Sequence, residues 1–271
     1  MSNGAPPLTA LNPYSVYDVR GTTEFAHPIL LYFTLWQANI LNPFLIGKAL
    51  LERNLLLFIL PSVAQLMLYL HMAHKSFIMG VLLVVIIVFM LERKRLFLGL
   101  LRGISAGVVF SWGTWVISGV IILPSIIIGR LFFVQPRNQF YYYEYFSGRN
   151  KAWFSNSKIG FLFEDTYATP LPELVGSEYT DSFANVAYFG DAYAQMGLLG
   201  ILFISIFLGI LLYISDLLIS GENTLSVAII VAAMFNLVNT GLTTSILTMG
   251  IAFSFLLATG YQLANMDDHI D

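Results

Sequence analysis

The stretch Arg130-Leu-Phe-Phe-Val-Gln-Pro-Arg-Asn-Gln-Phe-Tyr-Tyr-Tyr-Glu-Tyr-Phe146 is polar, aromatic and basic, and it opens a segment of similar character that runs to Asn185. The rest of the chain is strongly apolar. Of its 271 residues 57% are hydrophobic and 11% are charged, and the mean hydropathy is +0.75. A soluble domain carries about 25% charged residues, so this composition indicates a membrane protein. We expect its chemistry in the polar segment.

The apolar runs predict an all-α fold, a polytopic transmembrane helical bundle of about six or seven spans with one long loop. The predicted spans are 28–47, 54–72, 76–91, 104–128, 187–214, 225–242 and 245–263. Polar residues and Pro43 predict a broken helix in the first of these. The resulting layout is a polar N-terminal segment (1–27), the first membrane helices (28–128), the loop (129–186), the last membrane helices (187–263) and a cytoplasmic tail (264–271).

Lysine and arginine in the short connections predict the orientation of the spans. The 47–54 and 91–104 connections carry six cations, which places both on the cytoplasmic side and the long loop outside. The loop nevertheless holds five of the thirteen cations of the chain, Arg130, Arg137, Arg149, Lys151 and Lys158. An anionic ligand explains so many outward cations better than topology does.

Arg130 and Arg137 are the first candidates for that ligand. A guanidinium presents a planar fork of donors that fits phosphate oxygens and stays protonated. Their spacing would place them on one face of a helix, but Pro136 makes an unbroken helix unexpected here. The alternative is that both arginines meet lipid headgroups at the membrane surface.

The second candidate group is aromatic: Tyr141, Tyr142, Tyr143 and Tyr145 surround Glu144. Tyrosine rings stack on sugars and their hydroxyls bond sugar hydroxyls, but the same residues form interfacial belts or simply pack. Glu144 is a candidate general base.

A third group, His71-x-x-His74-Lys75, stands at the outer end of a span. His74 is a candidate general base and Lys75 a candidate phosphate contact, with a solvated turn as the alternative. The two histidines lack an evident third ligand, so no metal site is predicted.

Other features narrow the function classes. The chain has no cysteine, no Walker A pattern and no Asp-x-Asp pair in the loop, and a net charge of −3 gives no sign of nucleic-acid binding. No acidic residue stands convincingly in the middle of a span, which disfavours proton-coupled transport. The polar residues Asn39, Asn42, Asn236, Asn239 and Thr240 suit hydrogen bonds between helices.

Several of these stretches resemble the bacterial O-antigen and oligosaccharide repeat-unit polymerases. They are Trp36-Gln-Ala-Asn-Ile-Leu-Asn-Pro-Phe44, His74-Lys-Ser-Phe77, Arg130-Leu-Phe-Phe133 with Pro136, Tyr142-Tyr-Glu-Tyr-Phe146, and Asn185-Val-Ala-Tyr-Phe-Gly-Asp-Ala-Tyr-Ala-Gln-Met-Gly197. Members of that family usually have more spans. By this resemblance, the chain is a shortened member or the C-terminal portion of one.

The resemblance implies a metal-independent, cofactor-free glycosyltransferase of the bacterial inner membrane with a periplasmic active site. It would join polyprenyl-diphosphate-linked oligosaccharides, with Arg130 and Arg137 on the diphosphate and a possible chain-length regulator as partner. His74 and Glu144 are the first candidates for the general base, and Asp191 is the next. Two other readings stay open: a transporter or flippase of lipid-linked glycans, and a non-catalytic subunit of a polysaccharide assembly complex.

Overall fold

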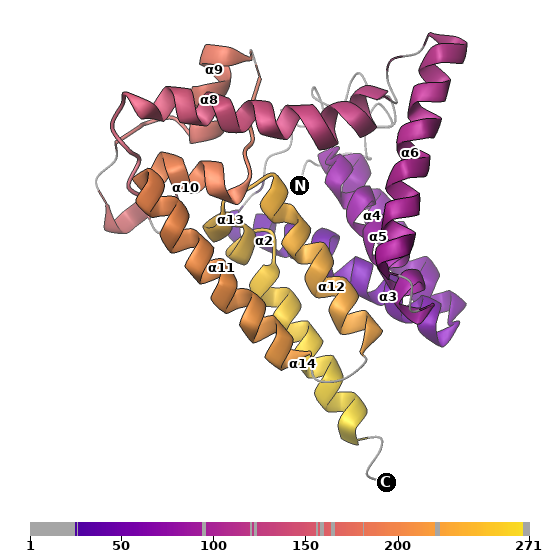
Figure 1. Cartoon of the computed structure of the whole chain (residues 1–271). Coiled ribbons are helices and arrows are strands. Elements are labelled where there is room, and N and C mark those ends of the chain that lie inside the picture. Colours follow the sequence, from indigo (N-terminus) through magenta and orange to yellow (C-terminus); the bar gives the residue numbers. More distant parts are fainter. Residues whose placement is uncertain are drawn as a thin grey trace. The chain divides into compact units, whose positions relative to one another are not determined.

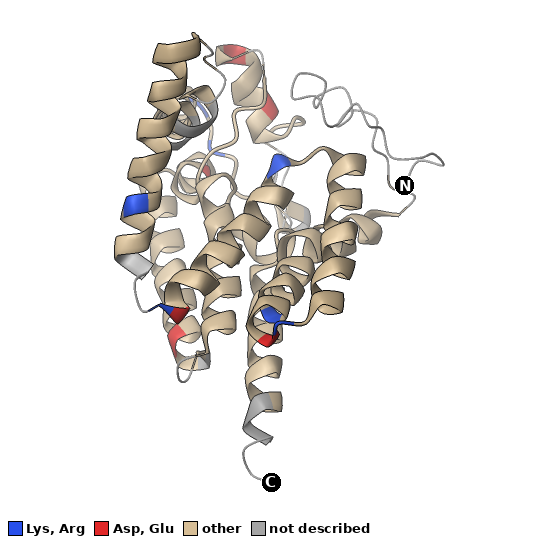
Figure 2. Cartoon of the chain, turned by 90° about the vertical axis from the view of Figure 1, so that its right-hand side faces the viewer, with Lys and Arg blue, Asp and Glu red and all other residues tan. Residues whose placement is uncertain are grey.

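The computed structural model describes residues 25, 27–93, 96–119, 121, 124–155, 157, 160–163, 166–180, 182–219 and 223–267. Every regular element among them is helical, which confirms the predicted all-α class (Figure 1). Six helical segments are long and apolar enough to cross a membrane: Pro28–Glu52, Leu55–Met72, Lys75–Glu92, Leu98–Ser118, Leu198–Leu217 and Leu242–Ala264. Charged residues lie mostly at helix ends and in connections, while the helix bodies are largely uncharged (Figure 2).

Two of the predicted spans have different boundaries in the structure. The 104–128 run is interrupted because α6 (Leu96–Ser118) ends before Gly119, whose φ is +68°. The 187–214 run is likewise two helices, α10 (Tyr188–Met196) and α11 (Leu198–Leu218), separated by Gly197 with φ +67°. A left-handed backbone ends a helix and favours glycine, which hydropathy averages do not register.

The last two predicted spans also differ. The 225–242 run is a shorter apolar segment, Thr224–Val238, made of α12 (Thr224–Met234) and the 3₁₀ turn η5 (Phe235–Val238). The 245–263 run is α13 (Leu242–Leu247) followed by α14 (Ile251–Asp267). Gly250, with φ +93°, lies between them, and a Cβ there would come within 2.8 Å of Ile40.

The chain divides into two compact units. The first contains α2 (Pro28–Trp36), the π-helix η2 (Gln37–Leu41), α3 (Asn42–Glu52), α4 (Leu55–Met72), α5 (Lys75–Glu92), α12 and α14. The predicted broken helix at 28–47 is wrong, because helical structure continues from α2 into α3. The Asn42 N–H donates to the Gln37 carbonyl across the wider π turn, which accommodates Pro43 without a break.

Gln65 of α4 forms hydrogen bonds with three other helical segments of the first unit, η2, α3 and α5. Its Nε2 donates to the Ala38 carbonyl at 2.9 Å and the Phe77 carbonyl at 2.7 Å, and its Oε1 accepts from Asn42 Nδ2 at 2.9 Å. Gln65 and Asn42 are both buried. Trp36 adds a bond from Nε1 to the Leu247 carbonyl and stacks on Phe253. The hydrogen bond between helices that the sequence predicts for Asn42 is therefore present.

The second unit comprises residues 95–214 and 236–245. Its described elements are α6, the π-helix η3 (Ser125–Val134), α8 (Gln135–Ser147), the 3₁₀ turn η4 (Gly160–Leu162), α9 (Leu171–Tyr179), α10, and most of α11, η5 and α13. The predicted long loop is therefore partly helical. Ser125 to Ser147 is one helical stretch, and α9 is a second helix within the loop.

We expect Gln65→Leu to lower the free energy of unfolding by about 1–3 kcal/mol, since three bonds of a buried amide are lost. The measurement is denaturant unfolding of the purified protein in lipid bicelles. Gln262→Leu in α14 is the matched control, because Gln262 Nε2 is buried without a partner among the described residues and should cost little to remove. Equal losses in both variants would contradict this role of Gln65.

Candidate functional site

Helix α8 is the platform of the second unit. Pro136 is its second residue, a position where the missing N–H is tolerated, and the π-helix η3 leads into it without a break. The expectation that Pro136 prevents a helix is therefore wrong. Because a helix places residues three, four and seven apart on one side, α8 presents two different faces.

The face of α8 toward α10 carries Gln135, Asn138, Gln139 and Tyr142. Asn138 is buried and its Nδ2 donates to the Asn185 carbonyl at 2.7 Å. Gln135 Nε2 donates to Asn239 Oδ1. This amide row lies on the side of the helix that packs against the start of α10.

The other face of α8 carries Arg137, Tyr141 and Glu144, at spacings of four and three. The Arg137 guanidinium lies 5.6 Å from the centre of the Tyr141 ring. Glu144 is exposed. Desolvation raises the pKa of Tyr179, and the negative charge of Glu144 raises it further. The structure thus brings together a predicted phosphate contact, a predicted sugar contact and a candidate base.

Asp191 lies in the first turn of α10. Gln195 Nε2 donates to Asp191 Oδ1 at 3.3 Å, and Gln195 Oε1 accepts from the Phe154 N–H at 2.7 Å. Gln195 is 2% exposed, so its amide is fixed at both ends. The hydrogen bond from Gln195 thus orients one oxygen of the Asp191 carboxylate.

Burial raises the pKa of Asp191 to about 6, against a smaller lowering by the Gln195 hydrogen bond. Its charge also adds to the raised pKa of Tyr142, which desolvation mainly causes. Gly241 makes the close packing possible, because any Cβ there would overlap the Asp191 carboxylate. Perturbed carboxyl groups of this kind are typical of functional sites.

A groove of about 480 Å³ lies within the same unit, and its lining on α10 ends at Phe189, two residues before Asp191. Its lining is mostly apolar: Gln135, Pro136, Gln139 and Phe140 of α8, Ala187, Tyr188 and Phe189 at the start of α10, and Leu237 and Val238. Sequence reasoning missed Gln139, Gln195 and this groove. The only signal for Gln195 is its place four residues after Asp191, one helical turn along.

The four tyrosines proposed to contact sugar have different surroundings. Tyr142 and Tyr145 are buried in a core cluster with Phe146, Leu171 and Val175. Tyr141 stacks on Tyr179 of α9 with ring centres 4.7 Å apart, and Tyr143 is 59% exposed beside Tyr193. Packing is thus the role that the structure gives Tyr142 and Tyr145. A ligand reaches Tyr143 without rearrangement.

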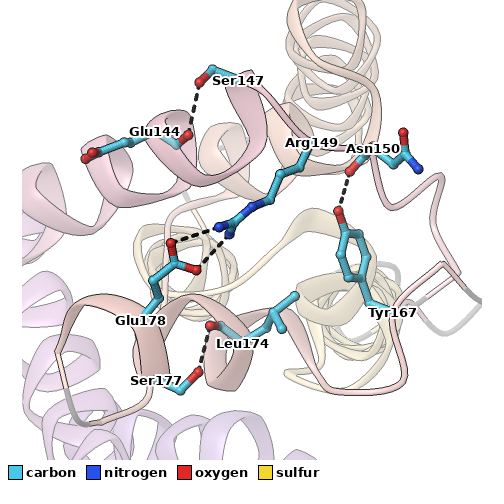
Figure 3. Close-up of polar contacts among 8 residues, drawn as sticks. All are labelled: Glu144, Ser147, Arg149, Asn150, Tyr167, Leu174, Ser177 and Glu178. Atoms are coloured by element: carbon cyan, nitrogen blue, oxygen red, sulfur yellow. Dashed lines mark hydrogen bonds and ion pairs between the residues drawn. The ribbon is translucent and has the colours of Figure 1, made fainter.

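Two of the loop cations have structural partners. Arg149 forms a two-pronged ion pair with Glu178 of α9, at 2.7 and 3.0 Å (Figure 3). Its guanidinium also lies 3.9 Å from the centre of the Tyr145 ring. Lys151 Nζ donates to the Phe146 carbonyl near the end of α8 and lies 4.5 Å from the Tyr193 ring. Lys158 and the side chain of Arg130 lie outside the described residues, and Arg130 itself is in η3.

His74 and Lys75 belong to the first unit. His74 is the residue before α5, with its ring 5.4 Å from that of Phe77, and Lys75 is the first residue of the helix. Both are half-buried. That His74 and Lys75 act in one site with the cations of the second unit stays a prediction. Within the described ranges, no three His, Asp or Glu side chains lie close enough to hold a metal ion.

Searches for similar proteins found no match for this chain among protein-family models, curated proteins or solved structures.

Asp191→Asn should stabilise the protein in a pH-dependent manner. The folded pKa of about 6 lies above the usual 3.8, so the charged carboxyl costs stability at high pH and that cost disappears as the pH falls. We expect a gain of about 3 kcal/mol at pH 7.5 that shrinks to about 1 kcal/mol at pH 4.5. Unfolding titrations of both proteins at the two pH values test this, and a gain independent of pH would contradict it.

Arg149→Glu should release α9 from α8, because it places two carboxylates where an ion pair stood. The expected result is faster hydrogen exchange in 171–179, restored by the reversed pair Arg149→Glu with Glu178→Arg. Glu173→Arg, a charge change of the same size and opposite sign in the first turn of α9, is the control; it breaks none of the ion pairs seen among the described residues and should speed exchange less. Failure of the reversed pair to restore protection would show that this contact does not hold α9.

Proposed function

We propose that this chain is a membrane glycosyltransferase that joins polyprenyl-diphosphate-linked oligosaccharide units into a longer polysaccharide. The observation that carries the proposal is Asp191: a carboxyl with a raised pKa that accepts a hydrogen bond from a buried amide, two residues along α10 from the lining of a groove large enough for a small ligand. The resemblance of residues 36–44, 74–77, 130–146 and 185–197 to repeat-unit polymerases supplies the substrate class. Six candidate spans supply the membrane setting that a lipid-linked substrate requires.

In the proposed reaction Asp191 is the general base. A hydroxyl oxygen of one lipid-linked unit attacks the anomeric carbon of the other and gives its proton to the carboxylate. The bond between that carbon and the diphosphate oxygen breaks, and polyprenyl diphosphate leaves with the bonding electrons. A base with a pKa near 6 is mostly ionised at neutral pH and accepts a proton more readily than an ordinary aspartate.

The leaving diphosphate needs fixed positive charge. Arg137 is exposed on α8, and its guanidinium lies 5.6 Å from the centre of the Tyr141 ring; among the described residues no ion pair or hydrogen bond occupies it. Arginine stabilises such a developing dianion without reorganisation. Arg130 and Lys75 are the further candidates. In this proposal the site is periplasmic and the protein is in the bacterial inner membrane.

The rival reading, a transporter of the same lipid-linked glycans, needs a polar passage through the membrane helices. The buried polar side chains Asn42 and Gln65 of the first unit instead bond one another and backbone carbonyls. This arrangement supports helix packing rather than a pathway, and it favours the transferase.

The test is polymerisation in vitro from two lipid-linked units, with the product length read on a gel. Asp191→Asn should reduce the rate by about 10²–10⁴-fold, the usual contribution of a general base. Arg137→Ala should reduce it as well, whereas Glu144→Gln, an exposed carboxyl of the same α8 segment, should change it little.

Complementation of a host that lacks its O-antigen polymerase repeats the comparison in cells at equal membrane levels. A full ladder of glycan lengths from Asp191→Asn would exclude Asp191 as the base. Loss of the ladder in Glu144→Gln would assign that role to Glu144. A well-inserted wild type that makes no ladder in either assay would favour transport or a partner role.

A further inference from the structure

Helix α8 carries an exposed apolar stripe on one side. Pro136, Phe140 and Tyr143 follow at spacings of four and three residues, which places them on the same side of the helix. All three are exposed, Phe140 to 71%. Phe133, three residues before Pro136, is 66% exposed. These four residues form the apolar stripe, and exposed apolar surface of this extent marks a contact with a protein or a membrane.

The neighbouring helices cover other sides of α8. Tyr145, two residues after Tyr143 and thus about 200° around the helix axis, is buried in a cluster with Leu171 and Val175 of α9. Asn138, at the same offset from Pro136, is buried and bonds to the backbone just before α10. The apolar stripe is therefore a side of α8 that neither α9 nor α10 buries.

A candidate membrane span begins close to α8 in the same unit. Only Gly197 separates α10, against which α8 packs, from the span Leu198–Leu217 of α11 (Figure 1). Leu198 is 76% exposed, as suits a side chain that faces lipid. Packed helices lie about 8–10 Å apart. Helix α8 is thus one helix away from the point where the chain enters the membrane.

Trp153 lies at the same place. Its N–H donates to the Gln195 carbonyl in the last turn of α10, and the side chain is 51% exposed. Its φ of +48° is in the left-handed region, which bulky side chains seldom adopt. The fold therefore holds an exposed tryptophan beside the start of α11. Tryptophan and tyrosine are enriched at the level of the lipid headgroups.

The charge and length of α8 fit the surface of a bilayer. Its thirteen residues are too few to span a membrane, and Arg137 is exposed directly after Pro136 of the stripe. A cation beside an apolar stripe meets lipid phosphates when the stripe is immersed. Phe140 also lines the groove described above together with Phe189, Leu237 and Val238, so apolar surface continues from the stripe toward α10.

We propose that α8 is an interfacial helix. Its apolar stripe is immersed in the headgroup region of the phospholipid leaflet in which α11 begins, and Arg137 pairs with lipid phosphates beside it. Helix α9 then lies on the water side of α8. The inference does not rest on the proposed function, since it concerns only phospholipids and the orientation of α8.

The absence of native cysteine allows the depth of single positions to be measured. Phe140→Cys in the stripe and Ser177→Cys in α9, both exposed positions, each carry one bimane fluorophore in nanodiscs of phosphatidylcholine and phosphatidylglycerol. Lipids with a nitroxide at two different depths of the acyl chain quench a label in the membrane, and iodide quenches a label in water. The ratio of the two nitroxide signals gives the depth.

The label at position 140 should lie about 5–10 Å within the boundary of headgroups and acyl chains, the depth at which interfacial helices bury their apolar face. It should escape iodide, whereas the label at 177 should be quenched by iodide and not by the nitroxide lipids. Equal iodide quenching at the two positions would overturn the proposal. Protection of position 140 from both quenchers would also overturn it and would assign the stripe to a protein partner, such as a second copy of the chain.

A second variant tests whether the rings hold the helix in place. Phe133→Ser combined with Phe140→Ser should raise iodide quenching of a bimane at Tyr143→Cys severalfold, because the loss of both rings releases the helix toward water. Phe183→Ser is the matched control, since Phe183 is 67% exposed and outside the stripe, and it should leave this quenching unchanged. Unchanged quenching after the loss of both stripe rings would contradict the anchoring role.

Discussion

The fold depends on one constraint: in a lipid environment each backbone N–H and C=O group must find its partner inside its own helix. The structure meets this constraint even where the sequence works against it. Pro43 and Pro136 each lack an N–H, and at both positions a π-helical stretch leads into the proline without ending the helix. Helices end instead at Gly119, Gly197 and Gly250, where the backbone turns left-handed.

Helix α8 lies outside the candidate spans, and it is a platform for another reason. A helix has several sides, so one segment of thirteen residues presents amides to α10 and a cation, a ring and a carboxylate to another side. The bidentate pair of Arg149 with Glu178 and the stack of Tyr141 on Tyr179 hold α9 against it. Part of the charge and aromatic density of this segment therefore serves packing, and the remainder is available for a ligand.

Buried polar groups of the two units fall into two kinds. Gln65 and Gln195 are paired at both ends of their amides, so they stabilise and orient their neighbours. Gln139 is equally an amide in a protein interior, but its atoms have no partner among the described residues. Residue type alone does not reveal this difference, because it depends on which groups a neighbour places within hydrogen-bond distance.

The sequence by itself determined the all-helical class, the membrane setting and most of the candidate spans, because these follow from composition and from the length of apolar runs. It also marked Arg137, Glu144 and Asp191 as groups able to do chemistry. Only the tertiary structure decided that Tyr142 packs in a core, that Arg149 is neutralised by Glu178, and that Gln195 orients Asp191. Each of these depends on contacts between residues distant in sequence or on the side of a helix that a neighbour covers. Local patterns record what a residue can do, whereas burial and partners decide what it does.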